Sequence, residues 1–343
     1  MKFYFLNKNP HNGPLAFTIH HWVGVLPITE YDGEYGCLII SKKFLLSDKK
    51  LQIQQILEIP DISKLLFLLD DTPEAIPYYV NFMEFYDILE NALNVSRDRG
   101  IVVYNNSFRS GIFKYSNLNT LYFPMFFFDS YNRNISKYSV NLNSDYDFSC
   151  FNRSIKPHKR KAVERIIDRN MNCLMTYGSN LTDGFFHESF KSLPEESNDD
   201  LEELQYFRGK VNICVESHTE NTLEGEGPFD NMIHLTEKTF RNISWGIPFV
   251  LISQKDSIKK LQNLGLHTFD SVIDESYDNI IDDDEKIEAS LDSAYTLLSK
   301  YNSNNVTDIL HENIKLIHDF DFLKNKLNEM FTIPLEKYIK DLV

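Results

Sequence analysis

The run Leu65-Leu-Phe-Leu-Leu69 passes directly into the polar stretch Asp70-Asp-Thr-Pro-Glu74, and a second apolar run, Ile101-Val-Val-Tyr104, follows further along the chain. Between the two runs, residues 77–95 carry apolar side chains at helical spacing. Short, continuously apolar runs are typical of strands that are buried on both faces, and a helix between two such strands forms a βαβ unit. The sequence therefore predicts an α/β fold with a parallel sheet.

The same alternation of apolar runs and helical patterns continues in the second half of the chain. Residues 157–169 predict a helix that has proline at its first position, where a missing N–H costs little. The helix predicted over residues 237–245 begins after Thr236, a favourable N-cap. Strands are predicted at 146–151, 174–177, 210–215 and 247–252, a short helix opened by a capping box at 253–256, and longer helices at 284–301 and 307–330. Residues 121–128 are the most apolar run and have the length of a strand.

Chain length and composition favour two domains. At roughly 100–200 residues per domain, 343 residues suffice for two hydrophobic cores. Residues 129–145 are rich in Asn and Ser and predict a linker. We therefore expect an N-terminal α/β domain over residues 1–140, a C-terminal α/β domain over 141–318, and a C-terminal helix within 319–343 that packs back across the domains.

The overall charge argues against a protein that coats nucleic acid. The 35 Lys and Arg against 50 Asp and Glu give a net charge of −15, whereas non-specific DNA binding needs an excess of basic residues. The four cysteines are widely spaced in apolar surroundings, so we expect reduced core residues. Because we find neither a membrane-spanning run nor a signal peptide, we expect a cytoplasmic protein, in the host cytoplasm if it is phage-encoded. The sequence leaves the oligomeric state open.

A basic segment follows the strand predicted at 146–151. Residues 153–169 hold seven Lys or Arg and two acids, a local charge of 7 − 2 = +5. A strand-to-helix loop lies at the carboxyl edge of a parallel sheet, where helix N–H groups and an arginine such as Arg153 are suited to bind phosphate. For Lys159, Lys161 and Arg169, we expect instead a solvated helix face.

The segment His234–Ile252 combines an acidic and a basic residue at a helix start with a glycine that leads into a buried strand. It resembles the donor-binding motif of the α1,3-fucosyltransferases, which runs approximately T-E-K-[LI]-W-x-N-A-x-x-x-G-x-V-P-V-V. The positions that match are Thr236, Glu237, Lys238, Asn242, Gly246, Pro248 and Val250. The aromatic match at Phe240 is loose. Without this resemblance, Glu237 and Lys238 are a first-turn charge pair that the helix dipole favours.

The next stretch, residues 264–278, ends in Asp-Glu-Ser-Tyr-Asp and is similar to a group of phage and bacterial proteins of glycosyltransferase type. That group also has an N-R-x-x-x-x-H-[RK] element upstream, matched here by Asn152, Arg153 and His158. The resemblance covers about residues 146–290. It implies a GT-B fold, in which two Rossmann-like domains face each other across a cleft.

The resemblance also implies the donor-binding residues. Lys238 and Arg153 would neutralise the diphosphate of a nucleotide sugar, and Glu237 would hold the ribose hydroxyls. Asn152, His158 and Thr236 belong to the matched elements. Glu216, at the predicted end of the strand over 210–215, is expected to line the donor pocket or contact the sugar. Fucosyltransferase similarity makes a guanosine diphosphate donor the first expectation.

A general base is expected in the N-terminal domain, within hydrogen-bond reach of the acceptor hydroxyl. The candidates are Asp70, Asp71 and Glu74, which follow an apolar strand, and the pair His20-His21. The carboxylates also fit a turn and a helix cap. Linear acidic runs such as 282–285 do not make a metal site by themselves, so we expect no metal and no cofactor other than the nucleotide-sugar co-substrate.

We therefore predict a glycosyltransferase that moves a sugar from a nucleotide-diphosphate sugar to a hydroxyl acceptor, with inversion and without metal. The acceptor is either a glycan or a hydroxylated base of phage DNA. The acidic charge favours the glycan, and the basic segment at 153–169 leaves DNA open. The alternative is a non-catalytic nucleotide- or glycan-binding module of the same fold.

Overall fold

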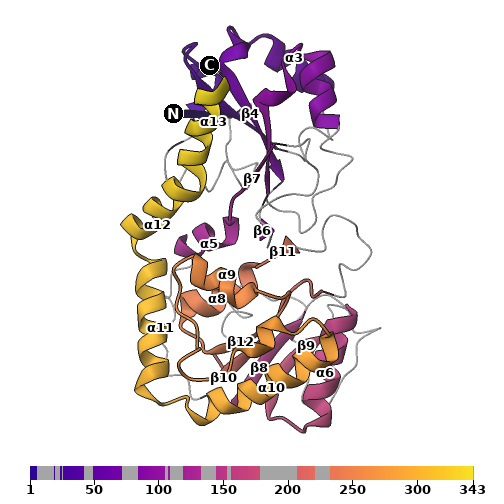
Figure 1. Cartoon of the computed structure of the whole chain (residues 1–343), viewed down its shortest axis with the longest axis vertical. Helices are drawn as coiled ribbons and strands as arrows, with labels where there is room; N and C mark the ends of the chain where they lie inside the picture. The colour runs from indigo at the N-terminus through magenta and orange to yellow at the C-terminus, as the bar shows by residue number, and fades with distance from the viewer. Residues whose placement is uncertain are drawn as a thin grey trace. The chain divides into compact units, whose positions relative to one another are not determined.

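The chain forms two compact units in a computed structural model (Figure 1). Unit 1 consists of Met1–Asp129 and Asp321–Val343, and unit 2 of Ser130–Phe320. The structure describes residues 1–5, 19, 24, 26–41, 49–71, 84–104, 107–108, 119–132, 144–152, 156–177, 207–220 and 232–342. Each unit is built on a parallel sheet, so the α/β class predicted from the sequence is confirmed.

The sheet of unit 1 has six parallel strands in the order β2-β1-β3-β4-β5-β7. The strands are β1 (Lys2–Phe5), β2 (Leu26–Pro27), β3 (Gly36–Ser41), β4 (Leu65–Asp71), β5 (Gly100–Tyr104) and β7 (Thr120–Tyr122). Two of them, β4 and β5, are the strands predicted from the two apolar runs. Leu65–Asp70 is buried throughout because β4 lies between two neighbours in the sheet and is covered on both faces.

The helices of unit 1 depart from the sequence pattern in two places. Before residue 130 the helices of unit 1 include α3 (Lys49–Leu57), α5 (Met125–Asp129) and the π-helix Ile88–Ala92. The run at 121–128, predicted as a strand, is divided between the end of β7 and α5, because Pro124 opens a helical turn that Met125–Asp129 continues. Of the helix predicted at 77–95, the described part is helical from 84 to 92 and residues 77–83 lie outside the described residues.

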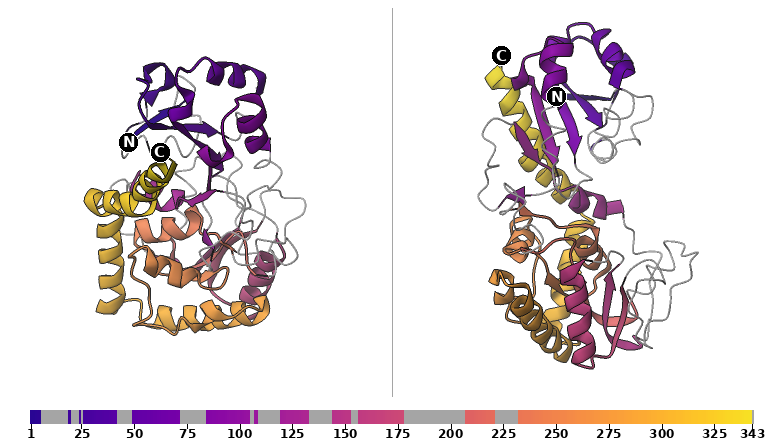
Figure 2. Two further views of the ribbon diagram at one scale, coloured as in Figure 1. Left: turned by 45° about the horizontal axis from the view of Figure 1, so that its top comes forward. Right: turned by 90° about the vertical axis from the view of Figure 1, so that its right-hand side faces the viewer.

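The C-terminal segment completes the core of unit 1. It contains α12 (Phe320–Leu327), the π-helix Asn328–Thr332 and α13 (Ile333–Leu342). The buried ring of Phe331 lies 6.0 Å from that of Phe3 and 5.0 Å from that of Phe123. Figure 2 shows this yellow segment beside the indigo N-terminal strands. Tyr338 fixes its end by donating a 2.7 Å hydrogen bond to the carbonyl oxygen of Asp98.

Unit 2 contains a four-stranded parallel sheet in the order β12-β10-β8-β9. Its strands are β8 (Tyr146–Asn152), β9 (Cys173–Tyr177), β10 (Gly209–Val215) and β12 (Phe249–Ile252). The chain runs from β8 to β9 on one side, and then from β10 to β12 on the other side. The order of the sheet therefore reverses between β8 and β10, and a crevice at the carboxyl ends of these two strands is where open α/β sheets bind ligands.

Helices cover both faces of this sheet. They are α6 (Pro157–Asp168), α8 (Glu237–Trp245), α9 (Ser257–Asn263), α10 (Asp283–Ser299) and α11 (Asn304–Ile317). The connections through α6 and α8 run in opposite directions, so the right-handed crossover rule places these two helices on opposite faces. Helix α10 packs against α6, β10 and β12, and α11 packs against α8. The site at the switch point is thus framed by the beginnings of α6 and α8.

Two of the helix predictions for the second half of the chain are wrong in part. The helix predicted over 307–330 is broken at His318, where α11 ends, and α12 begins at Phe320. The capping box predicted at 253–256 is wrong. Asp256 has the left-handed φ of 65° and makes no side-chain cap, and Asp278 instead accepts the hydrogen bond from the Ile258 N–H at 3.1 Å. A carboxylate distant in sequence replaces the local cap.

All four cysteines are buried and unpaired, as expected for core residues. Among the described residues, no helix has the length and apolar character needed to cross a membrane.

Two further short strands, β6 (Ser107–Phe108) and β11 (Met232–Ile233), complete the described elements of the sheets.

Candidate functional site

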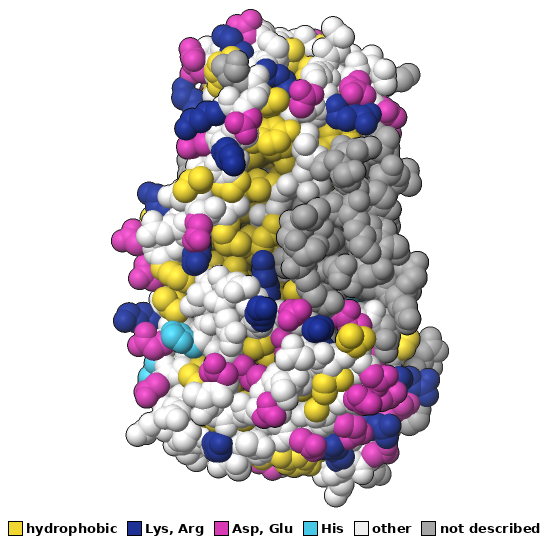
Figure 3. Space-filling view, in the orientation of Figure 1, with side chains coloured by type: hydrophobic (Ala, Val, Ile, Leu, Met, Phe, Trp, Pro, Cys, Tyr) yellow, Lys and Arg dark blue, Asp and Glu magenta, His cyan; other side chains and the backbone are white. Residues whose placement is uncertain are grey.

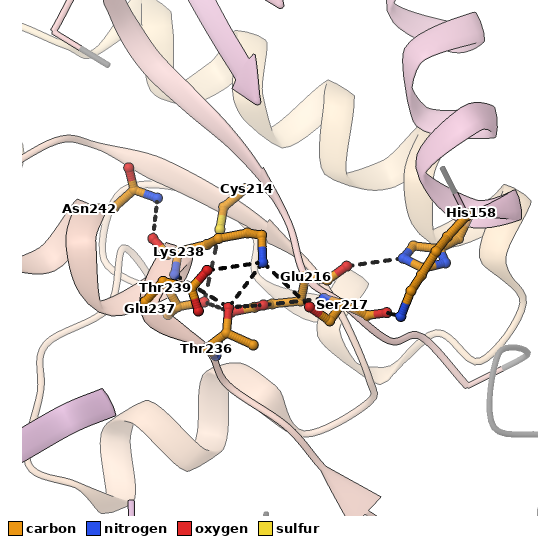
Figure 4. A network of polar contacts seen from close by, with 10 residues as sticks. His158, Cys214, Glu216, Ser217, Thr236, Glu237, Lys238, Thr239 and Asn242 are labelled. Carbon is orange, nitrogen blue, oxygen red and sulfur yellow. Dashed lines mark hydrogen bonds and ion pairs between the residues drawn. The ribbon is translucent and has the colours of Figure 1, made fainter. Parts of the chain in front are cut away.

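Four chain segments meet at the carboxyl edge of the unit 2 sheet. Strand β8 ends at Asn152, and β10 continues into Glu216 and Ser217. Helix α6 begins with Lys156 as N-cap residue, and α8 begins with Thr236 as N-cap residue. We call the group formed by Asn152, Lys156, Glu216, Ser217 and the residues from Thr236 to the first turn of α8 the switch-point site. Figure 4 shows its polar contacts.

Glu216 is the anchor of the switch-point site. Its side chain has no exposed surface, and its two carboxylate oxygens accept four hydrogen bonds. The donors are the Thr236 N–H at 2.9 Å, the Thr236 hydroxyl at 2.6 Å, the Thr239 hydroxyl at 2.5 Å and the Ser217 N–H at 3.2 Å. A buried carboxylate that accepts this many bonds fixes the first turn of α8 to the end of β10. The geometry assigns Glu216 to holding the site together.

A ladder of buried amides ties α8 to the sheet. Asn242 donates to Asn212 Oδ1 at 3.0 Å and to the Lys238 carbonyl at 3.1 Å. Asn212 donates in turn to Ser149 Oγ at 2.9 Å and to its carbonyl oxygen at 3.2 Å. The motif position Asn242 therefore connects α8 through β10 to β8. Its contacts hold the helix in place.

Gly246 ends α8 for two separate reasons. Its φ of +64° is the left-handed conformation of a helix C-cap, which glycine adopts without steric cost. A Cβ atom at this position would also lie 2.6 Å from Cδ1 of Ile314 on α11. The glycine of the motif thus lets α11 approach α8 and turns the chain toward β12.

Two lysine side chains converge on Ser217. Lys156 donates to the Ser217 carbonyl oxygen at 2.7 Å, and the Lys238 ammonium lies 3.4 Å from Ser217 Oγ. Lys238 also contacts Thr236 Oγ1 at 3.3 Å and pairs with Glu237 at 3.4 Å. The side chains of Lys238 and Glu237 are 18% and 33% exposed, so both keep contact with solvent. Two cations from two elements therefore stand at one edge of the sheet.

A third lysine, Lys159, is 1% exposed and contributes to the same field. Burial, and after it the charge of Lys238, lowers the pKa of Lys159 to about 8. Burial and the charge of Lys238 also lower the pKa of Lys156. For Lys238 burial acts in the same direction, but the carboxylates of Glu216 and Glu237 outweigh it and raise the pKa. The three ammonium groups repel one another, which favours an anionic ligand among them.

The histidines of this region are neutral. Burial lowers the pKa of His158 to about 4, and lowers those of His218 and His234 to about 3. His158 Nε2 lies 3.0 Å from the Glu216 carbonyl oxygen and joins α6 to the end of β10. The rings of His218 and His234 are in edge contact, 5.8 Å between centroids. The positive charge of the site therefore comes from lysine.

The other predicted donor residues are divided between the site and the part of the chain outside the described residues. Asn152 is fully buried; it donates to Cys150 Sγ at 3.3 Å, and its backbone N–H donates to Thr176 Oγ1. Thr236 caps α8 by accepting from the Lys238 N–H at 3.3 Å. Arg153 lies outside the described residues. Lys156 and Ser217 were not predicted as site residues, although Lys156 precedes Pro157 and Ser217 follows a strand-end glutamate.

The predicted base candidates lie in or near β4 of unit 1. Asp70, 1% exposed, pairs in register with Val103 of β5 and is near the carboxyl end of its strand. The backbone of Asp71 ends β4, opposite Tyr104. Glu74 and the pair His20-His21 lie outside the described residues. Of these candidates, Asp70 is the one whose side chain is described.

The basic face of α6 is neutralised within unit 2. Lys161 pairs with Asp284 at 2.8 Å, Arg165 pairs with Glu288 at 2.9 Å, and Arg169 pairs with both Glu288 and Asp292 of α10. Figure 3 shows acidic and basic side chains side by side over α6 and α10. The prediction of a solvated face was wrong for Lys159, which is buried. For Lys161 and Arg169, the acidic helix α10 supplies partners that local sequence does not indicate.

The Asp-Glu-Ser-Tyr-Asp segment acts as scaffold. Glu275 accepts from the Phe269 N–H at 2.8 Å, Asp278 accepts from the Ile258 N–H, and the Tyr277 hydroxyl oxygen accepts from the Leu251 N–H at 3.4 Å. These contacts join the loop after α9 to α9 and β12. Among the described residues, no group of three or more His, Cys, Asp or Glu side chains is arranged to hold a metal ion.

The comparisons with known proteins found no related family and a weak match to a solved structure. No family model matches the chain, and no curated protein matches it in sequence. A solved structure, the crystal structure of the DNA modifying enzyme beta-glucosyltransferase in the presence and absence of the substrate uridine diphosphoglucose, matches with a TM-score of 0.49 and 10% identity. The match covers 96% of this chain and 99% of that chain.

Proposed function

We propose that this protein is a glycosyltransferase of GT-B type, which transfers a sugar from a nucleotide-diphosphate sugar to a hydroxyl acceptor. The observation that carries the proposal is the convergence of Lys156 and Lys238 at the switch point of the unit 2 sheet. Departure of a nucleoside diphosphate adds negative charge to the leaving group, and preorganised cations stabilise that charge. The two lysines and the N-terminus of α8 supply positive potential at one place.

The neighbouring carboxylates support two different roles. Glu237 is one-third exposed beside Lys238, so it can accept hydrogen bonds from the ribose hydroxyls while Lys238 binds phosphate. Glu216 is buried and fully engaged, so we propose that it positions Thr236 and Lys238 without touching the ligand. In this proposal the ligand's diphosphate binds near Ser217, on which Lys156 and Lys238 converge.

For the chemical step, we propose direct displacement with inversion and without metal. Asp70 is our candidate for the general base, because a carboxylate near a strand end suits this role in parallel α/β sheets. In this scheme it takes the proton of the acceptor hydroxyl as the oxygen attacks the sugar carbon. The lysines of unit 2 stabilise the departing diphosphate.

The acceptor is a hydroxyl of a glycan or of a modified DNA base. One argument for DNA came from the +5 segment after β8. Because Lys161, Arg165 and Arg169 are paired with the acidic residues of α10, much of that charge is already neutralised within unit 2. This leaves the net charge of −15 as the stronger guide, and we favour the glycan.

A thermal-shift panel of nucleoside diphosphates and their sugars tests the donor site. A ligand at 100 times its dissociation constant should stabilise the protein by about 2.7 kcal/mol. Replacing Lys238 by Met should weaken binding by roughly 10- to 100-fold, since hydrogen bonds to charged groups contribute about 1.5–3 kcal/mol. Lys161→Met is the matched control, because Lys161 pairs with Asp284, and it should bind like the wild type. If none of the nucleoside diphosphates and sugar nucleotides raises the melting temperature, the proposal is rejected.

Turnover separates the enzyme from a non-catalytic binding module. With a donor identified, transfer is measured against a panel of glycans and against duplex DNA that contains hydroxymethylated bases. Asp70→Asn should abolish measurable transfer and leave the donor's dissociation constant within about twofold of the wild type. Donor binding by the wild type without transfer or donor hydrolysis would favour the binding module.

A further inference from the structure

Residues of the segment 256–279, which includes α9 (Figure 1), line a pocket of about 490 Å³. Ligand pockets are commonly about 300–1,000 Å³, so its size suits a small molecule. Five of the lining residues carry carboxylates and one carries an ammonium group: Asp256, Asp270, Asp274, Glu275, Asp278 and Lys259. The buried Lys286 donates to the Asp278 carbonyl oxygen at 3.4 Å and offsets part of this charge. The pocket is therefore acidic, and it shares no residue with the switch-point site.

Two of these carboxylates use one oxygen to hold the fold and have a second oxygen to spare. Oε1 of Glu275 accepts from the Phe269 N–H at 2.8 Å, and Oδ2 of Asp278 accepts from the Ile258 N–H at 3.1 Å. The other two oxygens, Oε2 of Glu275 and Oδ1 of Asp278, are buried and have no hydrogen-bond partner in the part of the chain that the structure describes. Asp278 is 6% exposed, and a buried carboxylate oxygen without a donor is costly. A ligand that donates hydrogen bonds in the pocket would remove this cost.

The electrostatics of the pocket favour a ligand with positive charge. Burial raises the pKa of Glu275 to about 7 and also raises the pKa of Asp278. The charge of Asp270 acts on Glu275 in the same direction, and so does that of Asp256 on Asp278. A cation near these carboxylates would stabilise their ionised forms and offset the repulsion between them.

The arrangement of the carboxylates distinguishes between kinds of cation. Among the described residues, no group of three or more His, Cys, Asp or Glu side chains is placed to hold a metal ion. The carboxylates are instead distributed over a pocket whose lining also includes the aliphatic side chains of Ile258 and Ile273. Separate anionic groups together with aliphatic surface match a molecule whose ammonium groups are joined by methylene segments.

We propose that this acidic pocket binds an organic polyamine, whose ammonium groups donate hydrogen bonds to the carboxylates while its methylene segments contact the two isoleucines. In this arrangement Glu275 and Asp278 are the less exposed contacts, and Asp270 and Asp274 are the exposed ones. The inference is independent of the proposed function, because the ligand of this pocket is a cation, whereas the ligand of the switch-point site is an anion. It gives the protein a second binding site with the opposite charge preference.

Isothermal titration calorimetry of the full-length protein with spermidine tests the inference. The titration is made at pH 8, where Glu275 is mostly ionised. We expect one spermidine to bind per chain, and butylamine, which has a single ammonium group, to bind at least about tenfold more weakly. No binding of spermidine, equal binding of butylamine, or displacement of spermidine by an equal concentration of Mg²⁺ would overturn the inference.

Variants that remove one charge and keep the size of the side chain locate the site. Glu275→Gln keeps an acceptor for the Phe269 N–H and should weaken spermidine binding by roughly tenfold. Asp270→Asn, at an exposed position, should weaken it by roughly threefold and serves if the Glu275 variant does not fold. Asp308→Asn, at an exposed position of α11, is the matched control and should bind like the wild type. Equal weakening by Asp308→Asn, or unchanged binding in the pocket variants, would assign the binding to overall charge and overturn the inference.

Discussion

Helices α6 and α8 begin at the same edge of the same sheet, yet their first turns are built in opposite ways. Helix α8 has a side-chain cap from Thr236, an acidic residue at its first position and the buried carboxylate of Glu216 against it. Helix α6 has no side-chain cap; it starts with Lys156, Pro157, His158 and Lys159, and has no acid in its first turn. Carboxylates therefore lie at the start of α8, whereas lysines lie at the start of α6.

The difference indicates that the starts of α8 and α6 have separate roles in the switch-point site. The carboxylate at α8 satisfies backbone and hydroxyl donors and so holds Lys238 in a defined place. The lysines at α6 increase the positive potential that the helix N-terminus already provides. The start of α8 thus provides a fixed position for Lys238, the start of α6 provides positive charge, and the two contributions can be tested separately.

Removing the anchor of α8 should have the largest effect. Glu216→Ala takes away four hydrogen bonds and leaves the buried donors of Thr236 and Thr239, and the partly buried N–H of Ser217, without this acceptor. We expect a loss of about 3–5 kcal/mol in the free energy of unfolding, measured by urea denaturation. Glu164→Ala, which breaks an exposed pair with Arg160, should cost less than about 1 kcal/mol. Equal effects of the two variants would mean that Glu216 does not anchor the helix.

The C-terminal ends of the two helices provide the second test. Gly246→Ala places a Cβ against Ile314 at a left-handed φ, and we expect a cost of about 2 kcal/mol. Helix α6 is followed by Asn170, which is exposed and has a φ of 50°. Asn170→Gly should therefore change stability by less than about 0.5 kcal/mol.

Combining Gly246→Ala with Ile314→Ala checks the cause of the loss. If the steric contact matters, the alanine at 246 should cost less in the background of Ile314→Ala than in the wild type. An unchanged cost would leave the backbone conformation as the whole explanation.

Acidification should weaken the attachment of α6 to β10 by a smaller amount. The pKa of His158 is about 4 when folded, against 6.5 ordinarily, so the unfolded chain binds more protons between these values. The stabilising contribution is complete above pH 6.5 and is lost as the pH falls toward 4. His158→Gln keeps a donor for the Glu216 carbonyl and removes the titration.

Denaturation at pH 7 and pH 5 measures this effect. Between these values the wild type should lose about 1–2 kcal/mol more stability than His158→Gln. His311→Gln, at an exposed position of α11, should follow the wild type. The same pH dependence in His158→Gln and in the wild type would assign the loss to other groups.

Most of the unit 2 sheet was predictable because its signals are local. Apolar runs indicated β8, β9, β10 and β12, and Pro157 and Thr236 marked the starts of α6 and α8. The run at 121–128 was misassigned because consecutive apolar residues fit a buried strand and a buried helix equally well. Its proline turned out to open the helix.

The sequence indicated some residues at the carboxyl edge of the unit 2 sheet and missed others. The motif pointed to Thr236, Glu237 and Lys238, which form the N-cap and the first turn of α8; their role in donor binding stays a prediction. The contact between Lys156 and Ser217 joins residues 61 positions apart, so no local pattern indicates it. For Lys159, sequence reports a charge in a basic run, whereas burial depends on how α6 packs against the sheet.

Unit 1 is discontinuous in sequence, and this affects how the protein is made. Its core includes Phe331, which packs on Phe3 and Phe123, so its last layer is synthesised after the whole of unit 2. During translation, part of the apolar surface of residues 1–129 stays exposed until Phe331 has been synthesised. The continuous unit 2 can fold as soon as it emerges from the ribosome. The order of folding on the ribosome is therefore expected to be the reverse of the order of the sequence.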